Sequence, residues 1–273
     1  MNINLELNKN TPFYIVNHYS PYDKKARVGF RAYYLYQKLK EEGWNVKLIL
    51  PNSNEKDVIV VKEGKFIKLI KPLLRIFPPD NSIAWSFKVF LYLKKKNKNK
   101  PFLLLTSSPP YSIGLIGLYC KWFCKKCTWI ADYRDLWTKN KLYNPPITKK
   151  YFNPILERKF LKNADLVVLN TKWDLNLNQN VFLCIKNKSI YMRNGFAKMV
   201  DNNSTVRNKL IYSGGTYKGL ATKGVLTLLN KLNEQGANII CDFYGEQDAF
   251  MENQKYINYC GSVASETVPE LLA

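Results

Sequence analysis

Two carboxylates and a guanidinium follow directly after an apolar run in the middle of the chain. The run begins at Trp129, and Asp132, Arg134 and Asp135 close it, with Trp137 beside them. An apolar segment that ends in charge is typical of a buried parallel strand, and ligands bind at the carboxyl edge of such sheets. A carboxylate at this edge can orient or deprotonate a hydroxyl group of a substrate. The alternative is a structural ion pair in which Arg134 only holds the two carboxylates.

Length and composition limit the class of protein. The chain has 273 residues, of which 46% are hydrophobic, and this is enough for one large or two ordinary domains. Its net charge is +21, from 42 basic and 21 acidic residues. Such an excess of positive charge indicates an anionic partner, which could be nucleic acid, an acidic membrane surface or a phosphorylated ligand.

One stretch concentrates this charge among large apolar side chains. From Lys62 to Lys100 there are eleven Lys or Arg and two acidic residues, a balance of 11 − 2 = +9. Cations mixed with large apolar residues suit an anionic lipid surface. Nucleic acid could use the same charge, but no nucleic-acid-binding module is recognisable in the sequence, so we expect no nucleic-acid partner. The tract Lys94–Lys100 predicts a solvated loop.

Cysteines and apolar runs give further expectations. Cys120, Cys124 and Cys127 recur at the spacing of one helix face and are interpreted as small buried hydrophobes. A metal site would need a fourth ligand, and the only histidine, His18, is far away in sequence, so we expect no metal and no other cofactor. The start of the chain has no features of a secretory signal, and no apolar run is long enough to span a membrane. These observations predict a soluble or peripheral protein of a reducing cytoplasm.

Strand and helix patterns alternate along the chain, which predicts parallel sheets with helices on both faces. Asn194-Gly195 and the polar segment after it interrupt the alternation, which then restarts. We therefore expect two domains, residues 1–200 and 208–273. The predicted strands are Phe13–Val16, Val46–Leu50, Phe102–Thr106, Trp129–Ala131, Leu166–Leu169, Ser189–Met192, Leu210–Tyr212, Ile239–Tyr244 and Ile257–Cys260. The predicted helices are Tyr33–Leu39, Tyr111–Lys125, Leu156–Lys162 and Val225–Leu232, with another beginning at Glu266.

A series of short motifs, in order along nearly the whole chain, carries a family resemblance. The motifs are His18–Pro21 followed by Val28–Arg31, Glu42–Val46, Thr106–Pro110, Ala131–Trp137, Leu156–Lys159 with Ala164-Asp165, Arg193–Phe196 and Tyr212–Gly219. Together they resemble the GT-B glycosyltransferases of family 4, in the subgroup that builds bacterial surface polysaccharides. The resemblance implies a GT-B-like α/β fold with two Rossmann-like domains. It also implies transfer of a sugar, without a metal, from a nucleotide-sugar donor to a lipid-linked or saccharide acceptor.

The resemblance also assigns roles to individual residues. The diphosphate of the donor would be bound by backbone N–H groups and cations, for which Gly29, Arg31, Gly214, Lys218 and Lys223 are the candidates. Asp132, Arg134 and Asp135 would lie on the acceptor side of the cleft as the catalytic group. His18 would line the same cleft, and Trp137 would either stack on a sugar or complete the core.

The sequence also departs from the family pattern. Tyr22–Lys25 fills a loop that is usually richer in glycine, and the chain ends before the late Glu-rich segment that grips the donor. We therefore expect the second domain to be incomplete. The alternative function is a truncated, non-catalytic remnant that binds a membrane or a partner. For the enzyme we expect a cytoplasmic location, peripheral at the inner face of a bacterial membrane.

Overall fold

The structure, a computed structural model, describes residues 8–21, 29–64, 77–98, 100–141, 143–195, 209–214, 220–245, 254–263 and 267. The chain divides into two compact units, Met1–Gly195 and Phe196–Ala273. Predicted features that fall on Lys218, on the basic residues within 65–76 and on the helix expected from Glu266 lie outside the described residues.

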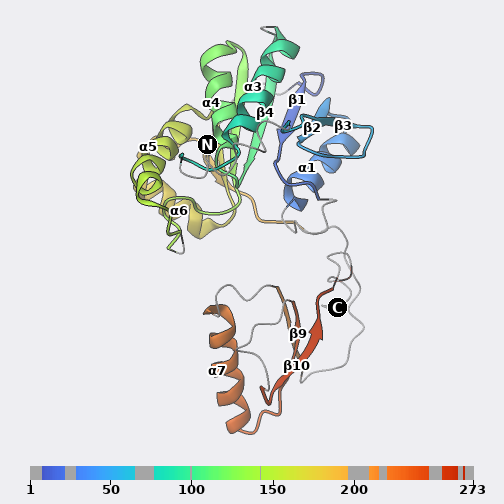
Figure 1. Cartoon of the computed structure of the whole chain (residues 1–273), viewed down its shortest axis with the longest axis vertical. Coiled ribbons are helices and arrows are strands. Elements are labelled where there is room, and N and C mark those ends of the chain that lie inside the picture. The colour runs from blue at the N-terminus through green and yellow to red at the C-terminus, as the bar shows by residue number, and fades with distance from the viewer. Residues whose placement is uncertain are drawn as a thin grey trace. The chain divides into compact units, whose positions relative to one another are not determined.

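The first unit is built on a parallel sheet of seven strands, in the order β3-β2-β1-β4-β5-β6-β7. Figure 1 labels β1 to β4 of this sheet. Its strands are β1 (Phe13–Val16), β2 (Val46–Leu50), β3 (Val58–Val60), β4 (Phe102–Ser108), β5 (Cys127–Tyr133), β6 (Leu166–Leu169) and β7 (Ser189–Tyr191). The strand order reverses between β1 and β4, where Val16 lies opposite Thr106. Ligands of open α/β sheets bind at such a reversal, beyond the carboxyl ends of the strands.

Helices cover both faces of this sheet, as the sequence predicts. They are α1 (Phe30–Glu41), α3 (Ile83–Asn97), α4 (Ile113–Phe123), α5 (Ile147–Asn163), α6 (Lys172–Val181) and the short 3₁₀ helix η1 (Leu183–Ile185). Successive residues of β1 point to opposite faces, so Ile15 packs with α1 while Val16 packs into the core beneath α3, α4 and α5.

The prediction of a loop over Lys94–Lys100 is wrong, because α3 continues to Asn97. Trp85, Val89 and Leu93 recur every four residues on its buried face, and each is completely buried. The lysines at positions 94–96 belong to the same helix and are exposed to solvent. Positive charge in the last turn is also favourable beside the unpaired carbonyl groups at a helix C-terminus.

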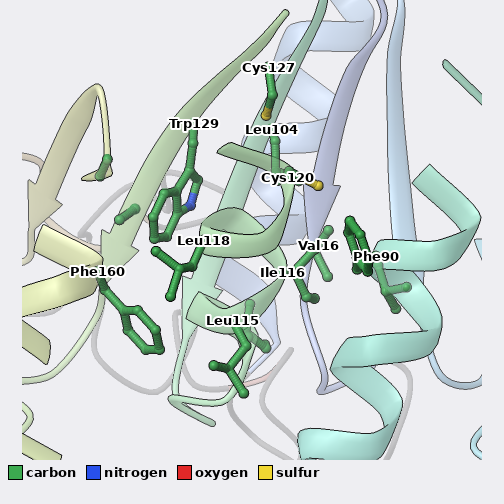
Figure 2. Packing of buried hydrophobic residues seen from close by; sticks show 14 of the residues in the cluster. Val16, Phe90, Leu104, Leu115, Ile116, Leu118, Cys120, Cys127, Trp129 and Phe160 are labelled. Atoms are coloured by element: carbon green, nitrogen blue, oxygen red, sulfur yellow. The ribbon is translucent and has the colours of Figure 1, made fainter. Parts of the chain in front are cut away.

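Two glycines bring α4 close to its neighbours in the core, among them the rings of Trp129 and Phe160, which Figure 2 shows beside this helix. A Cβ atom on Gly117 would lie 1.9 Å from Cε2 of Trp129, a side chain that is itself fully buried. A Cβ atom on Gly114 would lie 2.5 Å from the ring of Phe160. The glycines therefore allow α4 to pack directly on two large aromatic rings.

This packing predicts opposite effects for two substitutions of helical glycines. We expect Gly117→Ala to lower the free energy of unfolding by at least about 1–3 kcal/mol, because the buried Trp129 ring has no room to move. We expect Gly224→Ala in the second unit to be neutral or to stabilise by up to about 1 kcal/mol, since its Cβ would meet no atom within 4 Å. Urea unfolding of both variants checks this, and an equal effect at the two positions would contradict it.

The second unit is smaller. Its described elements are β8 (Lys209–Ser213), α7 (Leu220–Glu234), β9 (Ile240–Tyr244) and β10 (Ile257–Gly261). The strands form a parallel sheet in the order β10-β9-β8. Among the residues of this unit that the structure describes, the buried apolar ones are Leu226, Leu229, Cys241 and Phe243. The α/β alternation that the sequence predicts after the break is thus confirmed for these elements.

Candidate functional site

A buried ion pair stands at the carboxyl edge where the strand order reverses. The Arg31 guanidinium, in the first turn of α1, binds the Asp132 carboxylate at the end of β5 through Nη2, at 2.8 Å, and through Nε, at 3.1 Å. The Ser107 hydroxyl, from β4, donates to the same carboxylate at 2.8 Å. The Arg31 side chain is 5% exposed and that of Asp132 is 1% exposed. Neighbouring strands and a helix N-terminus therefore converge on one desolvated charge pair.

Arg134 does not pair with Asp132 in this arrangement, although the structural alternative considered for the sequence joined them. Its Nε donates to the carbonyl oxygen of Ser108 at 3.1 Å, and its Nη2 donates to that of Pro109. Its guanidinium also lies 5.9 Å from the centre of the Tyr19 ring. Burial lowers the pKa of Arg134, and the nearby Asp132 and Asp135 oppose that shift. Arg134 thus fastens the turn after β4 to the end of β5.

The other two candidates of the motif have contrasting surroundings. Asp135 is exposed to solvent at the same edge of the sheet. Trp137 is 1% exposed, and its ring stacks on Tyr111 at 4.6 Å and on Phe160 at 5.7 Å. Of the two roles considered for Trp137, the structure therefore favours packing in the core over stacking on a sugar.

His18 follows β1 and contacts residues from several segments of the chain. Its Nε2 lies 3.0 Å from Oε1 of Glu63 and 3.2 Å from the hydroxyl of Ser82, which precedes α3. Its ring meets that of the fully buried Trp85 edge to face at 5.0 Å. His18 thus connects the end of β1 to the segment after β3 and to the start of α3.

Gly29 precedes α1 and lies against its own chain. A Cβ atom at this position would come within 2.7 Å of the Tyr19 carbonyl oxygen and of the Pro21 nitrogen. Only glycine therefore lets the start of α1 approach the loop after β1 this closely. The role in phosphate binding that the resemblance assigns to Gly29 stays a prediction.

Four polar residues at this edge were not predicted as site residues from the sequence. Ser107 binds Asp132, Glu63 binds His18, and Asn194 accepts a hydrogen bond from Nη1 of Arg31 at 3.2 Å. Asp80 accepts from the backbone N–H groups of Ser82 and Ser112, at 3.0 and 2.9 Å, where α3 and α4 begin. Of these four, only Asp80 could have been recognised in the sequence, because Asp-Asn-Ser directly before an apolar helix is a typical N-capping pattern.

A second buried carboxylate lies behind the edge, on α5. Glu157 is 2% exposed and accepts hydrogen bonds from the backbone N–H and the hydroxyl of Thr138. Burial raises its pKa to about 7, although the Thr138 hydrogen bonds and the charge of Lys139 act in the opposite direction. This motif residue therefore titrates near neutral pH.

The donor-site candidates of the second unit follow its first strand. Gly214 has a φ of +153°, and its N–H donates to the Tyr244 carbonyl oxygen at 3.0 Å. A Cβ atom on Gly245, after β9, would lie 2.0 Å from the Gly214 oxygen. Lys223 lies exposed in the first turn of α7. Gly214 and Gly245 thus allow the backbone to pack closely at the carboxyl edge of this sheet. The N-terminus of α7, with the cation of Lys223, follows Gly214 in the chain.

The described residues contain no group of three or more His, Cys, Asp or Glu side chains that could hold a metal ion. Cys120, Cys124 and Cys127 are all buried in the core, as expected, but they do not share a helix face, because α4 ends at Phe123 and Cys127 begins β5. No helix among the described residues is long and apolar enough to cross a membrane.

Comparison with solved structures places the fold. Sucrose-phosphate synthase from Thermosynechococcus elongatus is similar with a TM-score of 0.63 and 15% sequence identity, over 95% of this chain and 72% of that one. The spinosyn forosaminyltransferase SpnP is similar at a TM-score of 0.44 and 12% identity, over 93% of this chain and 70% of that one. No protein-family model and no curated protein sequence matches the chain. The GT-B-like α/β fold predicted from the motifs is thereby confirmed.

Proposed function

We propose that this protein is a glycosyltransferase that moves a sugar from a nucleotide-sugar donor to a lipid-linked or saccharide acceptor in bacterial surface-polysaccharide synthesis. The observation that carries the proposal is the edge where the strand order reverses: Arg31 pairs with Asp132 there in a GT-B-like fold, and the exposed Asp135 follows three residues later. The likeness to sucrose-phosphate synthase supports this proposal through the fold, and the ordered motifs support it through the sequence.

The geometry supports different roles for the three catalytic candidates. Asp132 accepts hydrogen bonds from Arg31 and Ser107 and is buried, so in our proposal it positions the start of α1. Arg134 positions the turn after β4. Asp135 is the exposed carboxylate, and we assign to it the orientation or deprotonation of the acceptor hydroxyl.

The donor would be held by backbone N–H groups and cations without a metal ion. In this proposal the second unit contributes the compact edge at Gly214, the N-terminus of α7 and the charge of Lys223, with Lys218 beside them in sequence. A diphosphate that gains negative charge as the sugar leaves is stabilised by such fixed dipoles and cations. The acceptor side would be approached from an anionic membrane surface at the inner face of the membrane.

This arrangement predicts the effect of one lysine on donor binding. We expect Lys223→Ala to weaken binding of UDP or GDP by about 1–3 kcal/mol, as for a charge-assisted contact. Lys231→Ala, an exposed lysine in the last turn of the same helix, should leave the affinity unchanged. Isothermal titration calorimetry of the whole chain measures both. Equal affinities for the two variants, or no binding by the unmodified chain, would contradict the proposed donor site.

A further inference from the structure

Large apolar side chains stand exposed on the outer side of α3 and α4, which pack side by side (Figure 1). We call these residues the aromatic surface: they are Phe87, 48% exposed, Leu91, 47%, Trp122, 52%, and Phe123, 55%. Scattered exposed hydrophobic residues are common, but a contiguous group of this kind marks an interaction site.

Ring contacts join the two helices into one surface. The ring of Phe87 on α3 lies 6.2 Å from that of Tyr119 on α4, and Tyr119 lies 6.2 Å from Trp122. Phe90, beneath the surface, lies 5.9 Å from Phe123. The exposed rings therefore share a rigid base of packed aromatic residues.

Lysines lie at one end of this surface, and acidic residues are missing from the same stretch of sequence. Residues 81–127 contain nine lysines and neither Asp nor Glu. The ammonium group of Lys94 lies 5.5 Å from the centre of the Phe123 ring. The exposed lysines in the last turn of α3 and directly after α3 and α4 are Lys94, Lys95, Lys96, Lys98, Lys125 and Lys126.

We propose that the aromatic surface and its lysines dock this protein onto a bilayer that contains anionic phospholipid. Aromatic and aliphatic side chains enter the boundary between headgroups and acyl chains, while lysines bind the acidic headgroups. Nucleic acid would satisfy the lysines but would leave Phe87, Leu91 and Trp122 without an apolar partner. The inference rests on the proposed membrane location and is independent of sugar transfer.

Phe87 is the residue of this surface nearest the carboxyl edge of the sheet, whereas Trp122, Phe123 and the exposed lysines lie toward the opposite edge, at the C-terminal ends of α3 and α4. Phe87 is four residues beyond the start of α3, a rise of about 6 Å along a helix axis. Ser82, directly before α3, is bound to His18 at the carboxyl edge.

Tryptophan fluorescence of the whole chain tests the aromatic surface. Of the six tryptophans, Trp85, Trp129 and Trp137 are buried, whereas Trp122 and Trp173 are 52% and 62% exposed. Vesicles of phosphatidylcholine with phosphatidylglycerol should shift the emission to the blue, and Trp122→Phe should remove this shift. Trp173→Phe, the matched control on α6, should keep it. A shift that Trp122→Phe leaves unchanged would overturn docking by this surface.

Vesicle flotation tests the lysines. Each lysine near an acidic surface contributes about 1 kcal/mol, so Lys95→Gln with Lys126→Gln should weaken binding roughly 30-fold. Lys172→Gln with Lys186→Gln, exposed lysines of another region, should change it less than twofold. An equal loss of vesicle binding in the two double variants would overturn the proposal, and so would equally strong binding to vesicles of phosphatidylcholine alone.

Two further results would separate this inference from the proposed function. No binding to anionic vesicles, with UDP binding intact, would overturn the docking surface and leave the donor site standing. Binding to RNA that competes with the vesicles and is insensitive to Trp122→Phe would assign the lysines to nucleic acid instead and also overturn the proposal.

Discussion

Replacing Asp132 by Ala should lower the free energy of unfolding of the first unit by about 3–5 kcal/mol. The reason is the charge that remains: the Arg31 guanidinium is 5% exposed and would lose the carboxylate that neutralises it. The Ser107 hydroxyl would also lose its acceptor. Urea unfolding followed by tryptophan fluorescence measures this unit alone, because all six tryptophans lie within residues 1–195.

Two controls show whether the effect comes from the buried pair. Asp135→Asn removes an exposed carboxylate three residues away and should change the stability by less than about 0.5 kcal/mol. Arg31→Met combined with Asp132→Leu removes both charges and should recover most of the loss, since an apolar pair can replace a buried ion pair. If the double variant were as unstable as Asp132→Ala, the loss would not stem from an unpaired arginine.

Most strands of the fold could be predicted because their pattern is local. β1, β2 and β6 have the predicted bounds, since each is an apolar run that ends at a turn or at polar residues. α3 was missed because its apolar stripe carries so many lysines that the segment resembled a solvated tract. α6 was missed because its sequence, from Lys172 to Val181, is mostly polar and only one of its residues is buried.

The candidate site could be predicted only as a position at the edge of the sheet. The run from Trp129 to Asp135 indicates that charge gathers there, but it cannot indicate which cation pairs with which carboxylate. Arg31 is 101 residues before Asp132 in sequence, and the two meet only because β1 lies next to β4 and β4 next to β5. Arg134, only two residues after Asp132 in sequence, binds backbone carbonyl oxygens instead. Long-range pairing of this kind depends on topology and leaves no mark in local spacing.

The two carboxylates of the motif, Asp132 and Asp135, have different surroundings and therefore suit different roles. The Asp132 carboxylate is buried, and its oxygens already accept hydrogen bonds from an arginine and a serine, so it is not accessible to a substrate hydroxyl group. An exposed carboxylate at the same edge is accessible to an acceptor. In our proposal, positioning by Asp132 and Arg134 is therefore separate from the contact with substrate, which we assign to Asp135.

Glu157 gives the second large expected effect, and its sign depends on pH. Burial raises its pKa to about 7 from the ordinary value of 4.5, so the folded state holds the proton more tightly than the unfolded chain. Its contribution to stability is therefore most favourable below pH 4.5 and falls as the pH rises to 7. The difference of about 2.5 pKa units corresponds to a loss of about 3 kcal/mol, complete above pH 7.

Replacing Glu157 by Gln should remove this loss, because the amide stays neutral while its carbonyl oxygen can still accept the hydrogen bonds from Thr138. We expect the variant to be more stable than the unmodified protein at pH 8 by up to about 3 kcal/mol, and to have no such advantage at pH 4.5. Glu41→Gln, on the exposed side of α1 with 69% of its side chain accessible, should show no difference between the two pH values.

Urea unfolding by tryptophan fluorescence at both pH values provides the test. A Glu157→Gln variant that is equally destabilised at pH 4.5 and pH 8 would mean that Glu157 is ionised in the folded protein throughout this range, and that its charge is stabilised by the hydrogen bonds of Thr138 and the nearby Lys139.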